Sequence, residues 1–152
     1  MRTLLCLAVV LAACSKAETP AVDSTTAVMA AAPMMLTAAD VGGTWNGMSM
    51  GETSDSVTNR WTTESTDDTH GTLTIAGSKD AIPFTRMLDG DSMIVTSNAP
   101  YANRADAKGP KLNFRSVGRL KDGKLVGTVV TTLADKPDSV VARGRWEATR
   151  AP

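Results

Sequence analysis

The clearest strand pattern in the chain is 112-LNFRSVGRLKDGKLVGTVVTTL-133. Two runs of alternating apolar and polar residues flank Asp122-Gly123, a pair that readily takes the positive φ angles of a two-residue hairpin turn. The apolar positions of the first run are Leu112, Phe114 and Leu120, and those of the second are Leu125, Val129 and Leu133. This pattern predicts two antiparallel strands that share one apolar face.

The same signals recur on both sides of this hairpin. Asp89-Gly90 predicts a second hairpin, and further strands are expected near 43–51, 57–64 and 71–76. The other alternating apolar positions are Ile82, Phe84, Leu88, Met93, Val95, Val140, Ala142 and Trp146, and the opposite faces carry Arg115, Arg119, Arg143, Arg145 and Glu147. No stretch of the domain predicts a long amphipathic helix. About eight strands in an antiparallel meander most economically close into an all-β, up-and-down barrel, because closure removes the exposed edges.

Two segments outside the alternation have their own patterns. Thr37-Ala38-Ala39-Asp40 has the spacing of a capping box, which predicts one helical turn ahead of Gly42-Gly43. The segment 98–111, with Tyr101 and Arg104, is expected to be a long irregular loop. A loop of that length is either a contact surface or a mobile excursion.

The N-terminus has the pattern of an export signal. Met1-Arg2 is followed by an apolar run from Leu4 to Leu11, and Ala12-Ala13 precede Cys14. The run is far shorter than the roughly 20 residues that cross a bilayer. The segment resembles a bacterial lipoprotein precursor, and the resemblance implies cleavage before Cys14, which then carries the lipid. With Ser15 next, it also implies attachment to the outer membrane of the cell envelope, facing the periplasm or the cell surface.

The expected organisation is therefore a lipoprotein signal peptide over 1–13, a lipidated cysteine and flexible tether over 14–36, and a β-barrel domain over 37–152. Cys6 is lost with the signal and Cys14 is consumed by lipid, so the exported domain has no thiol.

The 16 basic and 16 acidic side chains balance, which argues against a nucleic-acid partner. No cofactor is expected.

Gly43-Thr44-Trp45 opens the first expected strand. It resembles the Gly-x-Trp start of lipocalin-like barrels, and the layout that ends at Arg150 is similar to that of small β-barrel lipoproteins of bacterial envelopes. The resemblance implies that Trp45 plugs one end of the barrel under a basic residue of the last strand, where Arg143, Arg145 and Arg150 are candidates. It also implies non-enzymatic binding of a small apolar ligand. The candidate binding residues are Trp45, Trp61, Tyr101, Phe114 and Trp146.

A filled barrel is the simplest alternative, in which Trp45 is only a core residue. Small residues on the inward faces would favour a hollow barrel, and these are Ser97, Ser116, Gly118, Gly127 and Gly144. The competing class of function is an envelope interaction protein or inhibitor that uses the segment 98–111.

Three further motifs resemble parts of catalytic or metal-binding sites. Gly47-Met48-Ser49-Met50-Gly51 matches the Gly-x-Ser-x-Gly nucleophile elbow, but no helix is expected after it, and His70 is the only histidine. Met48 and Met50, with His70, could bind Cu(I) through soft thioether ligands. Asp67-Asp68 lacks the spaced ligands of a calcium loop. Core, surface and turn roles are the simpler interpretations of these residues.

Overall fold

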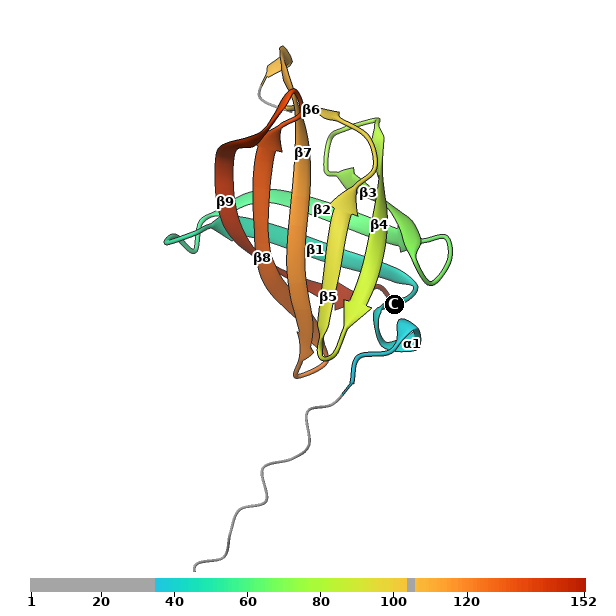
Figure 1. The fold of residues 1–152 in the computed structure, drawn as a ribbon. Helices are drawn as coiled ribbons and strands as arrows, with labels where there is room; N and C mark the ends of the chain where they lie inside the picture. The colour runs from blue at the N-terminus through green and yellow to red at the C-terminus, as the bar shows by residue number, and fades with distance from the viewer. Residues whose placement is uncertain (1–34, 104–105) are drawn as a thin grey trace, which may run out of the picture. The chain divides into compact units, whose positions relative to one another are not determined.

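The computed structural model describes residues 35–103 and 106–152, so Cys6, Cys14 and Arg104 lie outside the described residues. It confirms an all-β fold (Figure 1). The elements are α1 (Ala38–Val41), β1 (Thr44–Gly51), β2 (Val57–Ser65), β3 (His70–Ile75), β4 (Ala81–Asp89), β5 (Ser92–Ser97), β6 (Tyr101–Asn103), β7 (Asp106–Lys121), β8 (Lys124–Leu133) and β9 (Lys136–Arg150).

Eight of the nine described strands form a closed up-and-down barrel. From β1 to β5 and from β7 to β9, each strand pairs antiparallel with the next. The ring closes because β1 also pairs with β9, from Trp45↔Arg150 to Gly51↔Gly144, and β5 pairs with β7. The ninth strand, β6, pairs only with the start of β7. The expected meander of about eight strands is confirmed.

Both predicted hairpin turns are present. Asp122 and Gly123 have φ angles of 52° and 76°, as a two-residue turn between Lys121 and Lys124 requires. In the other hairpin Asp89 pairs with Ser92, so the two turn residues are Gly90 and Asp91, with φ 61° at Gly90. The turn is therefore one residue later than the Asp-Gly pair suggested.

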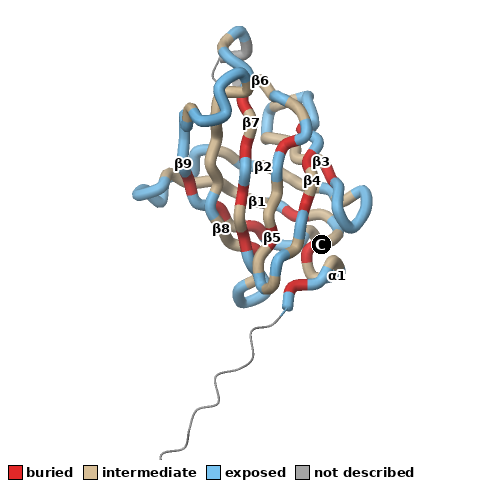
Figure 2. Tube along the Cα trace, in the orientation of Figure 1, coloured by how far each residue is buried: buried red, intermediate tan, exposed pale blue. Residues whose placement is uncertain are grey.

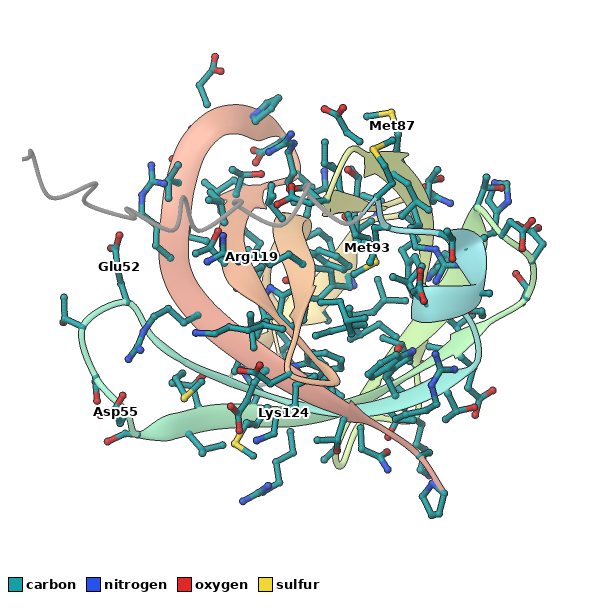
Figure 3. All side chains as sticks on the ribbon, turned by 90° about the horizontal axis from the view of Figure 1, so that it is seen from below. Glu52, Asp55, Met87, Met93, Arg119 and Lys124 are labelled. Carbon is teal, nitrogen blue, oxygen red and sulfur yellow. The ribbon has the colours of Figure 1, made fainter. Side chains whose placement is uncertain are left out.

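Side chains alternate between the lumen and the outer surface, as Figure 2 shows along β7 and β4. Met93 of β5 is buried within the ring, whereas Met87 of β4 projects from its outside (Figure 3). The core residues form two clusters, one around Trp45 and Trp146 and one around Ile82, Phe84 and Phe114. The alternation therefore places most of the expected apolar positions inside.

The segment 98–111 is not an irregular loop. Tyr101 pairs with Leu112 and Ala102 with Lys111, so the segment is largely a β6–β7 hairpin beyond the end of the barrel. Its Pro, Gly and charged residues suggested a loop, but such residues are tolerated where strand edges face water.

Val140 is not on the inward face. The pairing shifts between Thr131↔Ala142 and Thr132↔Val140, so one extra residue of β9 reverses the alternation there. Val140 is 43% exposed as a result.

One end of the barrel is covered by α1 and by the chain immediately before and after this helix (Figure 1). The Thr37 amide and hydroxyl donate to the Asp40 carboxylate, which confirms the predicted capping pattern and holds the pKa of Asp40 below its ordinary value. The Arg150 guanidinium lies 4.7 Å from the centre of the Trp45 ring and donates to the carbonyls of Gly42 and Asp40. Among the candidate arginines, Arg150 therefore covers the tryptophan.

Leu36 extends this closure. It is buried among the residues around Trp45, and its amide donates to the Gly90 carbonyl. Packing of the barrel thus begins one residue before the expected start at Thr37.

Candidate functional site

The barrel encloses a cavity of about 320 Å³. Its wall is mostly apolar and draws on all eight strands of the ring. The wall includes six aromatic residues and two valines, and these are Trp45, Trp61, Phe84, Tyr101, Phe114, Trp146, Val95 and Val129. The lumen is therefore partly filled by the two core clusters and also contains an open cavity.

The cavity is closed at one end and open at the other. Val41, Trp45 and Ala148 line it beside α1, and each is at most 3% exposed. Thr58 and Ala142 line it at the opposite end and are exposed to water. A ligand would therefore enter from the end that carries the β6–β7 hairpin.

The hollow centre follows from how two tryptophans pack. Trp61 pairs across the strands with Gly47, and Trp146 pairs with Gly127. A Cβ on Gly47 would lie 2.3 Å from the Trp61 ring, and one on Gly118, the partner of Gly127, would lie 2.4 Å from the Trp146 ring. Each indole therefore covers a glycine of the wall instead of extending across the lumen.

Phe84 repeats this arrangement. It pairs with Gly71, where a Cβ would come within 2.5 Å of the phenyl ring. The expectation that Gly118 and Gly127 themselves leave open space is wrong, because the Trp146 ring occupies the space above them. These glycines act indirectly, by letting the large rings lie against the wall.

The tryptophans offer no free polar atom to a ligand. Trp61 Nε1 donates to the Ser49 hydroxyl at 2.9 Å, and Trp146 Nε1 donates to the Thr128 carbonyl at 3.1 Å. The two rings meet edge to face, with their centres 5.9 Å apart. They present apolar ring surface to the cavity, which suits an apolar ligand.

Tyr101 and Phe114 form a second aromatic pair on the β6–β7 side of the cavity. Their ring centres lie 6.1 Å apart, again edge to face. Burial raises the pKa of the Tyr101 hydroxyl, and a hydrogen bond with Thr131 partly offsets that effect. Tyr101 is thus part of the cavity wall and is not an outward contact residue of the kind expected for an interaction loop.

All five aromatic residues that the sequence singled out line this one cavity: Trp45, Trp61, Tyr101, Phe114 and Trp146. Trp45 forms its floor, where its Nε1 donates to the carbonyls of Val41 and Gly42.

Arg86 is the residue that the sequence pattern missed. It lies on the inward face of β4 between Phe84 and Leu88, and it is only 3% exposed. Its guanidinium donates to the carbonyls of Val41, Asp67 and Asp68 and to the Ser65 hydroxyl, at distances of 2.8 to 3.1 Å.

These bonds define the role of Arg86. Five hydrogen bonds match the five N–H groups of the side chain, so its donors are already taken. Burial lowers its pKa, and the nearby carboxylates of Asp68 and Asp67 act in the opposite direction. Arg86 ties α1 to the β2–β3 turn beneath the cavity rather than holding a ligand.

The candidate copper ligands are not brought together. Met48 and Met50 pair with Glu147 and Arg145 of β9, and Met50 also borders the cavity. Met48 pairs with Arg60 of β2, and the neighbouring Trp61 pairs with Ile75, the last residue of β3. His70 is the first residue of β3 and lies at the other end of that strand. At about 3.3 Å per residue, the five positions from His70 to Ile75 separate the histidine from the methionines by more than 15 Å.

Two other motifs also have structural roles. Gly47 to Gly51 lie within β1, and the Ser49 hydroxyl faces Trp61, so the strand–turn–helix context of a nucleophile elbow is missing. The Asp67 carboxylate accepts hydrogen bonds from the Thr69 and His70 amides within the β2–β3 turn.

Comparisons with protein-family models, with curated proteins and with solved structures found no match for this chain. In the part of the chain that the structure describes, no helix has the length and apolar character needed to cross a membrane.

Proposed function

We propose that this protein binds one small apolar ligand inside its barrel and has no enzymatic activity. The observation that carries the proposal is the aromatic cavity, closed at α1 and open at the other end. Its volume of about 320 Å³ is at the lower end of the usual range for ligand sites, roughly 300 to 1,000 Å³. The ligand is therefore small.

The chemistry of the wall supports an uncharged or weakly polar occupant. The described lining holds only two charged residues, Arg86 and Arg143. The donors of Arg86 are engaged, and Arg143 pairs with Val130 on the outward side of β9. Hydroxyl groups at the open end, on Thr58, Thr131 and Tyr101, would suit a single polar group at one end of the ligand.

The test is titration with the neutral apolar dye N-phenyl-1-naphthylamine. Bound dye should quench tryptophan fluorescence by energy transfer, because Trp61 and Trp146 line the cavity. Saturable binding with one dye molecule per chain is expected. Absence of saturable binding to the folded protein would contradict the proposal.

Neighbouring residues on β8 provide a matched pair of variants. Val129 faces the cavity and Val130 faces outward, so Val129→Phe should fill the site while Val130→Phe should leave it open. We expect dye affinity to fall at least tenfold in the first variant and to stay unchanged in the second. Equal affinities would place the dye elsewhere.

We further propose that the barrel is held at the cell envelope by lipid on Cys14, as the resemblance of residues 1–14 to lipoprotein precursors implies. Several acyl chains on one residue give a stable anchor, whereas one chain alone binds only marginally. Cys14→Ser should abolish labelling with radioactive palmitate in the cell. Labelling that persists in that variant would rule out Cys14 as the lipidation site.

A further inference from the structure

A group of basic side chains covers the outer surface of β7, β8 and β9. We call this surface the basic face and define it by Arg115, Arg119, Lys121, Lys124, Arg143 and Arg145, all of them exposed. From residue 106 to residue 150, these strands and their turns carry ten basic and five acidic side chains, and the acidic ones are Asp106, Asp122, Asp135, Asp138 and Glu147. Cations therefore outnumber carboxylates two to one on this part of a chain whose basic and acidic residues balance overall.

The sheet register sets the arrangement of the arginines. Arg115 and Arg143 both pair with Val130 of β8, one from each side. Because adjacent strands are about 4.8 Å apart, the arginines of β7 and β9 form two rows roughly 10 Å apart. Arg119 and Lys124 can be located in Figure 3.

Among the described residues, three of the four arginines of the basic face form no ion pair, and these are Arg115, Arg119 and Arg143. Arg145 pairs with Asp55 at 2.8 Å. That pair is exposed, since Asp55 lies on the β1–β2 loop that projects from the barrel (Figure 3). Within the part of the chain that the structure describes, most of the positive charge of the face is therefore not neutralised by ion pairs.

Between the two arginine rows the surface is apolar and slightly hollow. Val126 and Val130 of β8 and Val117 of β7 are only partly buried there. A shallow depression lies between Arg119 and Arg145, with Val117, Val126, Thr128 and one carboxylate, that of Glu147, along it. Apolar patches bordered by arginine fit a layer of acidic headgroups, because the long side chains reach the charges while the valines contact the layer.

We propose that the basic face docks on an anionic phospholipid surface. Six cations are within the range of four to eight that attract a protein segment to acidic lipids, at about 1 kcal/mol for each residue near the surface. A second copy of this chain cannot use the same face symmetrically, because arginines would oppose arginines. The docking is independent of the cavity, and it would lay the barrel on its side against the membrane.

The experiment is co-sedimentation of the chain from residue 14 onward, carrying Cys14→Ser, with lipid vesicles. Removing the cysteine ensures that no acyl chain contributes to binding. The protein should bind weakly to vesicles of phosphatidylcholine alone and strongly to vesicles that also contain phosphatidylglycerol. Added salt should reverse the binding, because it screens exposed charges.

Two double variants with equal net charge test the face itself. Arg115→Gln with Arg119→Gln should weaken binding roughly 25-fold, about fivefold for each arginine. Arg60→Gln with Lys79→Gln removes the same charge from β2 and the β3–β4 turn and should change binding less than threefold. Unchanged dye affinity in the cavity would show that both variants are folded.

Two outcomes would overturn the proposal. Equal losses in the two double variants would mean that net charge alone attracts the protein to the vesicles. Failure to bind acidic vesicles, together with arginine-dependent binding to poly-L-glutamate, would identify an acidic polypeptide as the partner instead.

Discussion

At the scale of single residues, the cavity depends on glycines that never touch it directly. Trp61 has room to lie against β1 only because Gly47 has no Cβ, and a Cβ there would lie 2.3 Å from the ring. The ring would then have to move toward the centre of the barrel. The size of the cavity is thus set by the smallest side chains in its wall.

Gly47→Ala should therefore destabilise the protein by about 1 to 3 kcal/mol, the usual cost of overpacking, and should weaken dye binding. Urea unfolding measures the first effect and fluorescence titration the second. Gly51→Ala is the control for stability alone, because its Cβ would make only an ordinary 3.4 Å contact with Ser54, whereas Gly51 itself borders the cavity. Equal losses of stability in the two variants would mean that Gly47 is not needed to make room for the Trp61 ring.

Arg86 stabilises the closed end in a different way. Arg86→Gln would leave several buried carbonyls without donors, including that of Val41, at a cost of about 2 to 4 kcal/mol. Thermal and urea unfolding should show the loss. Arg115→Gln, an exposed arginine on the outer surface, should change stability by less than about 0.5 kcal/mol. A loss below about 1 kcal/mol in Arg86→Gln would show that α1 and the β2–β3 turn hold without the guanidinium.

At the scale of elements, the strands and hairpins could be predicted from sequence patterns that are local in the chain. The buried position of Arg86 could not, because it depends on contacts between distant segments. Alternation and the Asp-Gly pairs locate most strands, because period and turn chemistry are local properties. Arg86 occupies an inward position, but a charged residue is normally interpreted as exposed. Its partners come from α1 and the β2–β3 turn, so only the assembled fold satisfies it.

The candidate site also combines features that are local in the sequence with features that depend on the assembled fold. The aromatic residues could be identified because large rings at inward positions must line a barrel. Whether the barrel is hollow could not be predicted, since that depends on which glycine each ring meets across the strands, as Trp146 meets Gly127. The reversal at Val140 likewise depends on a bulge that alternation alone does not predict.

The β2–β3 turn should show a measurable pH dependence. The amide and hydroxyl of Thr69, followed by the amide and ring of His70, hold the pKa of Asp67 well below its ordinary value. A carboxyl group with a lowered pKa in the folded state stabilises the protein above its unfolded-state pKa, near 3.9. That stabilisation is lost as the pH falls through the folded-state pKa.

Asp67→Asn should therefore flatten the decline of unfolding free energy between about pH 4 and pH 2. Urea unfolding at a series of pH values measures this slope. Asp138→Asn, at an exposed position of β9, is the control and should retain the slope of the original chain. If Asp67→Asn retains it as well, the hydrogen bonds of the turn do not stabilise the charged form.

At the scale of the whole molecule, the barrel has two surfaces with separate physical properties. The lumen is aromatic and closed by α1, Trp45 and Arg150 at one end. The outer surface of β7 to β9 is basic. Because inward and outward residues alternate on the same strands, each surface can change with little effect on the other. Ligand binding and membrane docking should therefore be separable by mutation.

Ligand binding should also stabilise the whole barrel, because the cavity exists only when all eight strands of the ring are closed. At a free dye concentration of 100 times its Kd, the unfolding free energy should rise by about 2.7 kcal/mol. On β5, Val95 lines the cavity while its neighbour Ile94 pairs outward with Val117. Val95→Phe should abolish the dye-dependent rise, and Ile94→Phe should retain it. A rise that survives Val95→Phe would mean that the stabilising dye binds outside the lumen.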